Sequence, residues 1–295
     1  IAIKALGLTG EIITTPFSYV ATTSSIVWEG CTPIFVDIHQ EYLTIDETKI
    51  EAAITKNTTA ILATHVFGNP CAIDEIEGIA AKYNLKVIYD AAHCFGVTYK
   101  GKSVFNFGDI STCSFHATKL FHTGEGGALF TKSKELYDIL YFHHNFGHNG
   151  PEAFYGIGIN AKMNELQAAM GLSVLPYMDK ILKARQIIVT TYNDFFKDTD
   201  IQLLKIRGQV QWNYSYYPVI FKDETQLLKV QAALNAIHIF PRRYFYPSLN
   251  TIPYVKRENK KISESISSRV LCLPLYDSLE IEDVKKITAT VIHYI

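Results

Sequence analysis

Residues 114–127, SFHATKLFHTGEGG, place a lysine among serine, histidine and glycine residues. Lys119 follows the apolar run STCSF and precedes the glycine-rich turn GEGG. One interpretation is a surface lysine whose methylenes cover apolar neighbours while its ammonium reaches water. The other is a desolvated amine that attacks a carbonyl group. A lysine amine in water is almost wholly protonated at neutral pH, so the second interpretation requires burial or nearby positive charge.

Asp90 and His93 form a second group of reactive side chains, in the segment VIYDAAH. Asp90 directly follows an apolar run, just as Ser114 and Lys119 come at the end of another. A carboxylate at a buried strand end is costly unless a cation or a hydrogen-bond donor meets it. Asp90 alone is also compatible with a turn cap, a common role of aspartate. The two segments together supply a carboxylate, a histidine, a serine and a lysine, the kind of set that pyridoxal phosphate requires.

A third group, in FHHNFGHNG, consists of His143, His144 and His148. Histidines at this density raise the alternative of a metal site, but no carboxylate accompanies them at ligand spacing. The sequence therefore predicts an ordinary loop here and no metal.

The elements that must position these residues alternate between strand-like and helix-like segments over the first 135 residues. Apolar runs predict strands at 11–16, 33–38, 59–68, 85–96, 109–117 and 126–131. Helical spacing predicts helices at 19–30, 45–54 and 72–84. This order predicts an α/β fold, with a mainly parallel sheet and helices on both faces. Ligands of such sheets bind at the carboxyl ends of the strands.

The pattern changes after about residue 176, which predicts a large domain over 1–176 and a smaller α+β domain over 177–295. We expect a long joining helix at 177–198, an aromatic strand at 211–221 and further helices at 224–237 and 278–294. The proline-bounded loop FPRRYFYPSLN suits a sugar-diphosphate ligand, because arginine forks match phosphates and aromatic faces pack on rings. An exposed surface position is the alternative for either arginine. The candidate residues of this loop are Arg242, Arg243, Tyr244 and Tyr246.

Composition excludes several classes of protein. The 295 residues are 48% apolar and 19% charged, enough for a sizeable core, and the formal net charge of −1 gives no reason to expect nucleic-acid or anionic-membrane binding. No apolar run has the length of a membrane span. The five cysteines are dispersed without CxxC spacing, which predicts reduced thiols in the cytoplasm. The first residues, IAIKALGLTG, read as the end of a helix, so we expect the natural N-terminus to be missing.

Four stretches of the chain resemble the DegT/StrS family of pyridoxal-phosphate-dependent nucleotide-sugar aminotransferases. These stretches are DAAH…FG, SFHATK…GEGG, TPFSYVATTSSIVWEG and GINAKMNELQAAMG, and the resemblance runs from Leu6 to the C-terminal helix. It implies the type I fold of aspartate aminotransferase. One motif departs from the family pattern, because the helix-start Gly-Thr or Ser-Thr phosphate motif would lie just before Ile1.

The resemblance implies a role for each of six residues. Lys119 would form a Schiff base with the cofactor and then move the proton between substrate and cofactor. Asp90 would pair with the pyridine nitrogen and keep it protonated. The other four are Tyr19 stacking on the ring face, His93 reaching the 3′-oxygen where many relatives have glutamine, Ser114 bonding the phosphate, and Asn160 reaching a phosphate across a dimer interface.

A homodimer with shared active sites is also expected from the segment after Asn160. The run MNELQAAMGLSVL has a stripe of apolar residues wider than one surface helix usually needs, so a partner subunit could cover part of it.

The implied activity is transfer of an amino group from glutamate to a nucleotide-linked keto-deoxysugar. ATKLFHTGEGG and FPRRYFYP most resemble enzymes that make 4-amino-4,6-dideoxy sugars, which favours a 4-keto-6-deoxyhexose, and the product would enter a polysaccharide or another glycoconjugate. His116 and His122, which flank Lys119, are further candidate sugar contacts. A 3-keto sugar is the near alternative. Related sugar dehydratases replace the lysine with histidine, so Lys119 argues against dehydration, while a non-catalytic pyridoxal-binding module stays open.

Overall fold

A six-stranded sheet forms the centre of the larger part of the molecule. The computed structural model describes residues 1–295. Five neighbouring strands run parallel, and the last is antiparallel to its neighbour. Their order is β2 (Thr32–Phe35), β1 (Glu11–Thr14), β3 (Thr58–Thr64), β4 (Lys86–Asp90), β7 (Ile110–Ser114) and β8 (Gly127–Phe130). The mainly parallel α/β fold predicted from the sequence is therefore confirmed.

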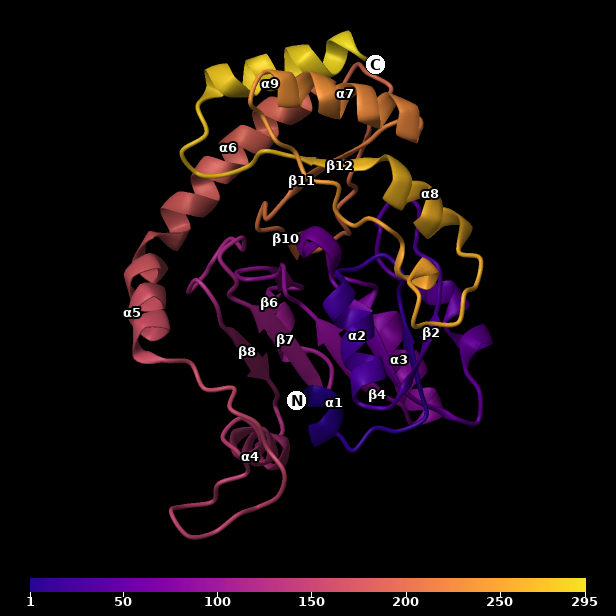
Figure 1. Cartoon of the computed structure of the whole chain (residues 1–295), viewed down its shortest axis with the longest axis vertical. Coiled ribbons are helices and arrows are strands. Elements are labelled where there is room, and N and C mark those ends of the chain that lie inside the picture. The colour runs from indigo at the N-terminus through magenta and orange to yellow at the C-terminus, as the bar shows by residue number, and fades with distance from the viewer.

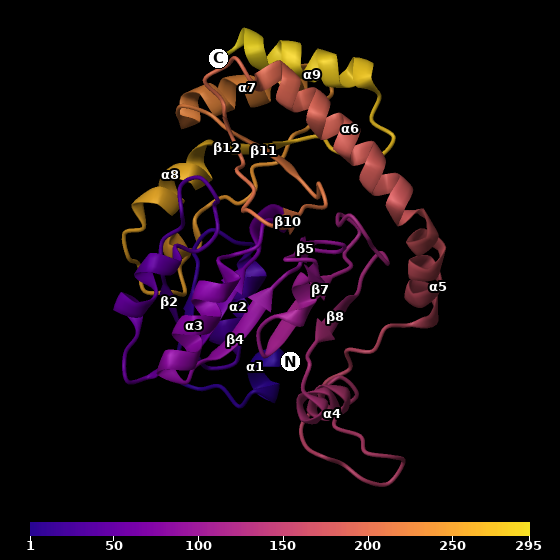
Figure 2. The ribbon, with the colours of Figure 1, turned by 180° about the vertical axis from the view of Figure 1, so that it is seen from behind.

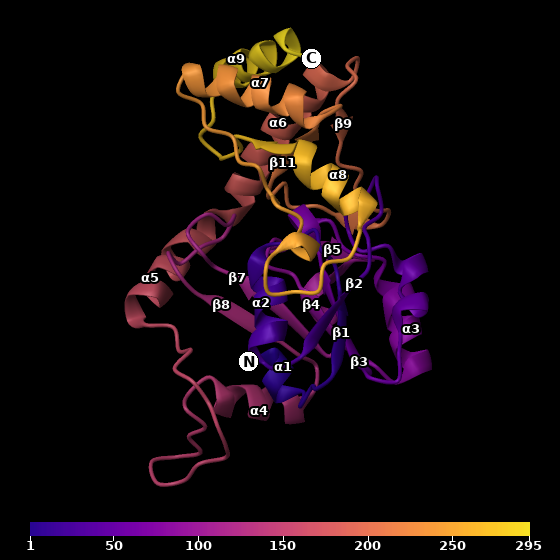
Figure 3. The same ribbon diagram turned by 45° about the vertical axis from the view of Figure 1, so that its right-hand side comes forward.

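Helices cover both faces of this sheet, because successive residues of a strand point to opposite sides. Ile61 and Ala63 of β3 pack in one core cluster with α3 (Ile73–Tyr83). Ala60 and Leu62 of the same strand pack in another cluster, on the opposite face. Figure 3 shows α3 on one side of the strands and α1 and α2 on the other. The helices of the second face are α1 (Ala2–Ala5), α2 (Val20–Trp28) and α4 (Lys134–His143).

The predicted helix at 45–54 is wrong. This stretch forms two short 3-10 turns, η1 (Glu47–Lys49) and η2 (Glu51–Ala53). The Asp46 side chain accepts hydrogen bonds from both the backbone N–H and the hydroxyl of Thr48. Such local side-chain bonds compete with the helical hydrogen-bond ladder, which favours a turn over a continuous helix.

A second, antiparallel sheet forms the core of the C-terminal part. Its order is β12 (Val270–Leu273), β11 (Tyr217–Ile220) and β9 (Gln202–Leu203). Three helices pack against it and bury Tyr192, Phe196 and Val219. Figures 1 and 2 show this unit above the larger sheet, reached through α5 (Glu165–Val174) and the long helix α6. The three packing helices are α6 (Met178–Phe196), α7 (Glu224–Ala236) and α9 (Ile281–His293).

Several contacts tie the C-terminal part to the larger sheet region. β10 (Val210–Gln211) pairs with β5 (Thr98–Tyr99), which in turn pairs with β6 (Lys102–Ser103). The carboxylate of Asp37 accepts the first N–H groups of α8 (Lys261–Arg269). The division of the chain at 176/177 stays a prediction.

The expected strand at 211–221 is interrupted. Only β10 and β11 are regular, and the residues between them are held by side chains instead of a ladder. This irregular segment runs beside the larger sheet, where it reaches the candidate site described below.

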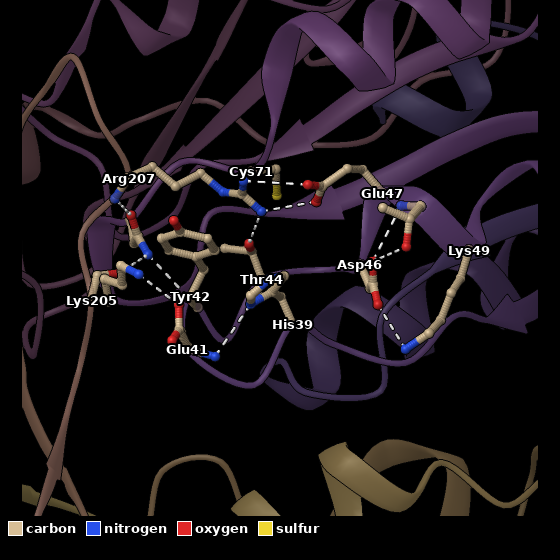
Figure 4. A network of polar contacts seen from close by, with 12 residues as sticks. His39, Glu41, Tyr42, Thr44, Asp46, Glu47, Lys49, Cys71, Lys205 and Arg207 are labelled. Carbon is tan, nitrogen blue, oxygen red and sulfur yellow. Dashed lines mark hydrogen bonds and ion pairs between the residues drawn. The ribbon is translucent and has the colours of Figure 1, made fainter.

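A polar network fixes the part of the chain that precedes β10. Figure 4 shows the Arg207 guanidinium bonded to Glu47, which lies in η1, and to Thr44, which lies in the loop before η1. The Asn69 side chain donates to the carbonyl of Lys205 and accepts the backbone N–H of Arg207. The segment before β10 is therefore attached to the larger sheet region through both side chains and backbone.

None of the helices has the length and apolarity that crossing a bilayer demands.

Candidate active site

Two neighbouring parallel strands place the predicted reactive side chains at one edge of the sheet. Asp90 ends β4 and Ser114 ends β7, and the two strands pair with Asp90 opposite Thr112. Lys119 follows β7 by a short loop. The carboxyl ends of both strands thus meet where a ligand of such a sheet binds.

A cavity of about 770 Å³ opens at this edge. Segments from both parts of the chain line it, including the loop 240–250 after α7, which contains the motif FPRRYFYPSLN. The sequence-predicted residues that line the cavity are Tyr19, Asp90, His93, Ser114, His116, Lys119, Arg242 and Tyr244.

The Asp90 carboxylate is held by two donors. The hydroxyl of Thr22, in α2, donates to one carboxylate oxygen at 2.6 Å. The backbone N–H of Ala92 donates to the other at 3.2 Å. These bonds fix the carboxylate at the strand end and offset part of the cost of burying its charge.

Lys119 is half-buried and projects its amine among aromatic rings. Its Nζ lies 3.5 Å from the hydroxyl of Tyr216, and 5.9 and 6.0 Å from the ring centres of Tyr216 and Tyr244. Burial lowers the pKa of the Lys119 amine, the Asp90 carboxylate opposes that effect, and the Arg242 guanidinium adds to it. The environment therefore favours a neutral, nucleophilic amine more than water does.

The turn after Lys119 depends on glycine at one position. Gly126 has a φ of 149°, and a Cβ there would lie 2.5 Å from the hydroxyl oxygen of Thr123. The hydroxyl of Thr123 instead donates to the carbonyl of Glu125. A side chain at position 126 would therefore collide with Thr123, so the turn next to the end of β7 requires glycine there.

His93 is a neutral imidazole with a defined tautomer. Its side chain is 5% exposed, and burial together with the Lys119 charge lowers its pKa well below the usual value. The backbone N–H of Phe67 donates to its Nδ1 at 3.1 Å. The ring proton therefore lies on Nε2, which leaves that nitrogen as a hydrogen-bond donor.

In the loop 240–250, some side chains line the cavity and others pack against the rest of the protein. Arg242 exchanges backbone hydrogen bonds with Cys272 of β12, and its guanidinium lies 4.9 Å from the ring centre of Tyr244. Burial raises the pKa of Tyr244 to about 12, so its hydroxyl stays protonated. Arg243 does not reach the cavity, because it donates to Glu224 and packs on the ring of Tyr246.

Three other predicted residues lie outside the cavity wall of a single chain. Tyr246 is half exposed, under the guanidinium of Arg243. His122 is partly buried beyond the lining. Asn160 accepts a hydrogen bond from Lys162 and lies in an exposed loop, although the adjacent Ile159 borders the cavity. Roles of these residues toward a ligand stay predictions. The histidines of FHHNFGHNG form no group of three or more metal-ligating side chains.

The sequence did not point to Thr22 and Tyr216. Thr22 lies three residues after Tyr19 on the first turns of α2, so helical spacing from a stacking aromatic was the available signal. Tyr216 lies in a segment that was read only as an aromatic strand, and nothing local marks which of its aromatics meets Lys119.

The residues at this cavity fit pyridoxal phosphate. The chemistry of the donor set is the reason: an amine with a lowered pKa, a carboxylate fixed by two donors and a neutral imidazole that donates through Nε2. Tyr19 adds an exposed aromatic face at the start of α2. Ser114 adds a hydroxyl at the end of β7.

Comparison with known proteins agrees with this arrangement. The dTDP-4-amino-4,6-dideoxy-D-glucose transaminase of Shigella dysenteriae is 42% identical over 297 residues, covering 98% of this chain and 81% of the relative. The enzyme of the same name from Escherichia coli is 40% identical over 300 residues, covering 97% of this chain and 80% of the relative.

The fold comparison gives the same result. The solved structure of DesI in the presence of its TDP-sugar product superposes with a TM-score of 0.92 at 30% identity, over 99% of this chain and 76% of that one. The model of the DegT/DnrJ/EryC1/StrS aminotransferase family matches residues 1–292. The resemblance seen in the four sequence stretches is confirmed, and the chain belongs to the DegT/DnrJ/EryC1/StrS aminotransferase family.

Proposed function

We propose that this chain is a pyridoxal-phosphate-dependent transaminase that transfers an amino group from glutamate to a nucleotide-linked 4-keto-6-deoxyhexose. The observation that carries the proposal is the Lys119 amine, with its lowered pKa, in one cavity with the fixed Asp90 carboxylate. Relatives at 40–42% identity are named for a 4-amino-4,6-dideoxy sugar, which supports position 4 as the site of amination.

Each cavity residue has a defined task in this function. Pyridoxal phosphate, when bound, supplies an electron sink for the bond-breaking at the substrate carbon. Asp90 places a negative charge opposite the pyridine nitrogen and thereby favours its protonated form. Thr22 and the N–H of Ala92 hold that carboxylate in place. His93, with its proton on Nε2, donates to the 3′-oxygen.

Lys119 holds the cofactor and then acts as the acid–base group. A positioned amine that takes a proton from one carbon and returns it to another contributes about 10²–10⁴-fold in rate. Its half-buried position lowers the pKa of the amine and limits competition from water.

Substrate recognition involves the mouth of the cavity. Arg242 offers a guanidinium fork for the diphosphate, while Tyr244 and His116 flank the space for the sugar. Tyr19 stacks on the cofactor ring and Ser114 bonds its phosphate. His122, Arg243 and Tyr246 serve the substrate only if the loops that carry them rearrange.

A second copy of the chain completes the site in this proposal. Asn160 reaches the phosphate of its partner's cofactor, and exposed apolar side chains on α5 and the preceding loop form the interface, including Ile157, Leu166 and Leu172. Residues 1–176 form the cofactor domain and 177–295 the smaller domain.

The function is tested by incubating the protein with pyridoxal phosphate, glutamate and a panel of nucleotide-linked 4-keto and 3-keto sugars, with products read by mass spectrometry. Amination of a 4-keto-6-deoxy sugar is expected. Borohydride reduction and peptide mapping should place the pyridoxyl mass on Lys119, and a label on another lysine would contradict the assignment. A protein that binds the cofactor but never forms the pyridoxamine spectrum with glutamate is a binding module.

The shared site is tested by mixing two inactive variants, Lys119→Ala and Asn160→Asp. The second change sets an anion against the cofactor phosphate. Random re-association makes about half of the dimers mixed, and each mixed dimer has one site free of both lesions, so about a quarter of wild-type activity should return. If Asn160 acted within its own chain, every site would carry a lesion and no activity would return.

A further inference from the structure

A lysine that carries a proton in a dry cavity needs a hydrogen-bond acceptor, since an ammonium presents three donors and no acceptor. Lys119 forms no ion pair with a carboxylate, and its Nζ has one hydrogen-bond partner, the Tyr216 hydroxyl at 3.5 Å. The nearby Asp90 carboxylate accepts from Thr22 and Ala92, and neither of its oxygens lies within ion-pair distance of the Lys119 Nζ. The phenol oxygen is the acceptor that remains.

Tyr216 lies directly behind the cavity. It is not among the residues that line the opening, but its ring centre lies 4.6 Å from that of His93 and 5.4 Å from that of Tyr244. Phe67 packs on another side, with a ring-centre distance of 5.7 Å. These contacts leave the ring little freedom to move and place its hydroxyl toward the Lys119 amine.

The backbone around Tyr216 is fixed by side chains from both parts of the protein. Arg185, a buried residue of α6, donates to the carbonyls of Tyr214 and Ser215 at 3.1 Å. The Ser215 hydroxyl donates to the carbonyl of Phe67 at 2.9 Å. Because these bonds flank Tyr216 on its N-terminal side, the position of its hydroxyl is determined before any ligand binds.

We propose that the Tyr216 hydroxyl is the acceptor that holds the Lys119 amine while this amine carries a proton. The inference rests on the proposed function, in which Lys119 takes a proton from a substrate carbon and later returns it. On taking the proton, the Nζ lone pair forms the new N–H bond while the substrate C–H bond breaks, and its electron pair stays with the substrate carbon, where the bound cofactor would accept it. The Tyr216 oxygen then accepts a hydrogen bond from the ammonium, and the ring faces of Tyr216 and Tyr244 add cation–π attraction. On release, the same proton leaves Nζ.

The other groups that face Lys119 do not take over this role. Arg242 repels an ammonium, and His93 is a neutral donor with its Nδ1 already occupied. Burial raises the pKa of the Cys113 thiol to about 12, so this group is uncharged. Asp90 attracts the ammonium from a distance, but its oxygens, which accept from Thr22 and Ala92, form no ion pair with Nζ. Burial also raises the pKa of the Tyr216 phenol, which therefore keeps its own proton and serves as a neutral acceptor.

The sign of the effect follows from this arrangement. An acceptor bonded to the ammonium stabilises the charged form of the amine, so removing the oxygen lowers the amine pKa. At 3.5 Å this hydrogen bond is long, so we expect it to contribute as an ordinary neutral bond does, which corresponds to a shift of about 0.3 to 1 pH unit. The observable is the pH midpoint for acylation of Lys119, because only the neutral amine reacts and the midpoint does not depend on how easily the reagent enters.

The experiment acylates the full chain, freed of cofactor, with isotope-coded acetic anhydride over a pH series and reads the Lys119 peptide by mass spectrometry. In Tyr216→Phe, the Lys119 midpoint should fall by about 0.3 to 1 pH unit. Tyr217→Phe is the matched control: this neighbouring tyrosine bonds Asn193 at 2.8 Å, and its loss should leave the midpoint unchanged.

An unchanged midpoint in Tyr216→Phe would overturn the inference, as would an equal shift in Tyr217→Phe. A second readout is the pH profile of kcat/KM for the keto sugar, because the enzyme form that reacts with the keto sugar has its Lys119 amine free; the limb of this profile should move in Tyr216→Phe in the same direction as the acylation midpoint. Failure of the wild-type protein to transfer an amino group would refute the proposed function instead, because the acylation measurement needs neither cofactor nor substrate.

Discussion

Replacing Arg207 by methionine tests the attachment of the segment that carries Tyr216. The guanidinium of Arg207 donates to the Glu47 carboxylate at 2.9 and 3.4 Å and lies 4.3 Å from the ring centre of Tyr42 (Figure 4). The Arg207 and Glu47 side chains are only 14% and 16% exposed. Methionine keeps most of the apolar contact but leaves the Glu47 carboxylate without its cation.

The expected cost follows from this burial. Removing one partner of a buried ion pair typically costs about 3–5 kcal/mol, because an uncompensated charge stays behind. Both side chains retain some contact with water, which reduces the penalty, so we expect Arg207→Met to lower the free energy of unfolding by about 2–4 kcal/mol.

Lys205→Met is the matched control, since Lys205 lies two residues earlier and pairs with Glu41. That pair is 56% and 54% exposed, so water screens it and its loss should leave stability unchanged within error. Urea unfolding, followed by tyrosine fluorescence at one protein concentration, measures both variants. If Arg207→Met unfolds at the wild-type urea concentration, or if Lys205→Met is equally destabilised, burial does not distinguish the two pairs and the reasoning is refuted.

Three further predictions concern buried polar groups near the sheet edge. Burial lowers the pKa of His65 from 6.5 to about 3, so the unfolded chain binds a proton that the folded chain excludes, and the free energy of unfolding should fall as the pH drops from about 6.5 toward 3. His65→Gln removes this titrating group and should reduce the slope by about 1.4 kcal/mol per pH unit, as measured by urea unfolding at several pH values. Asp90→Ala should keep the fold but lose most amino transfer, while Asp90→Glu should be less harmful, and near-normal turnover of Asp90→Ala would leave Asp90 a turn residue. Thr22→Val removes the 2.6 Å bond to Asp90 and should lower kcat by about tenfold with KM for the sugar nearly constant.

Much of the site was predictable because its residues follow apolar runs. Asp90 and Ser114 end strands whose buried, β-branched character is visible in the sequence, and neighbouring parallel strands must end at one edge. The same logic did not reach the segment between β10 and β11. Tyr214, Tyr216 and Tyr217 look alike in sequence, and which one meets Lys119 is decided by hydrogen bonds from Arg185, about 30 residues away along the chain.

The predicted helix at 45–54 failed for a related reason. Its apolar residues have helical spacing, but Asp46 and Thr48 satisfy the backbone locally, and the pull of Arg207 on Glu47 comes from more than 150 residues away. Long-range polar contacts of this kind leave no periodic trace. In this protein such contacts hold irregular segments at two places where the sequence predicted a regular helix or strand, at 45–54 and at 211–221.

Phe67 connects the two halves of the site, and its backbone fixes both of them in position. This buried residue has a φ of 55°, a conformation that costs a bulky side chain about 1–2 kcal/mol. In that conformation its N–H donates to His93, while its carbonyl accepts from the Trp212 indole at 2.8 Å and the Ser215 hydroxyl at 2.9 Å. Three hydrogen bonds offset the strain. The residue that sets the tautomer of His93 thus also anchors the segment carrying Tyr216. The His93 donor at the cavity and the Tyr216 hydroxyl beside Lys119 are therefore positioned by the two peptide units on either side of the Phe67 Cα.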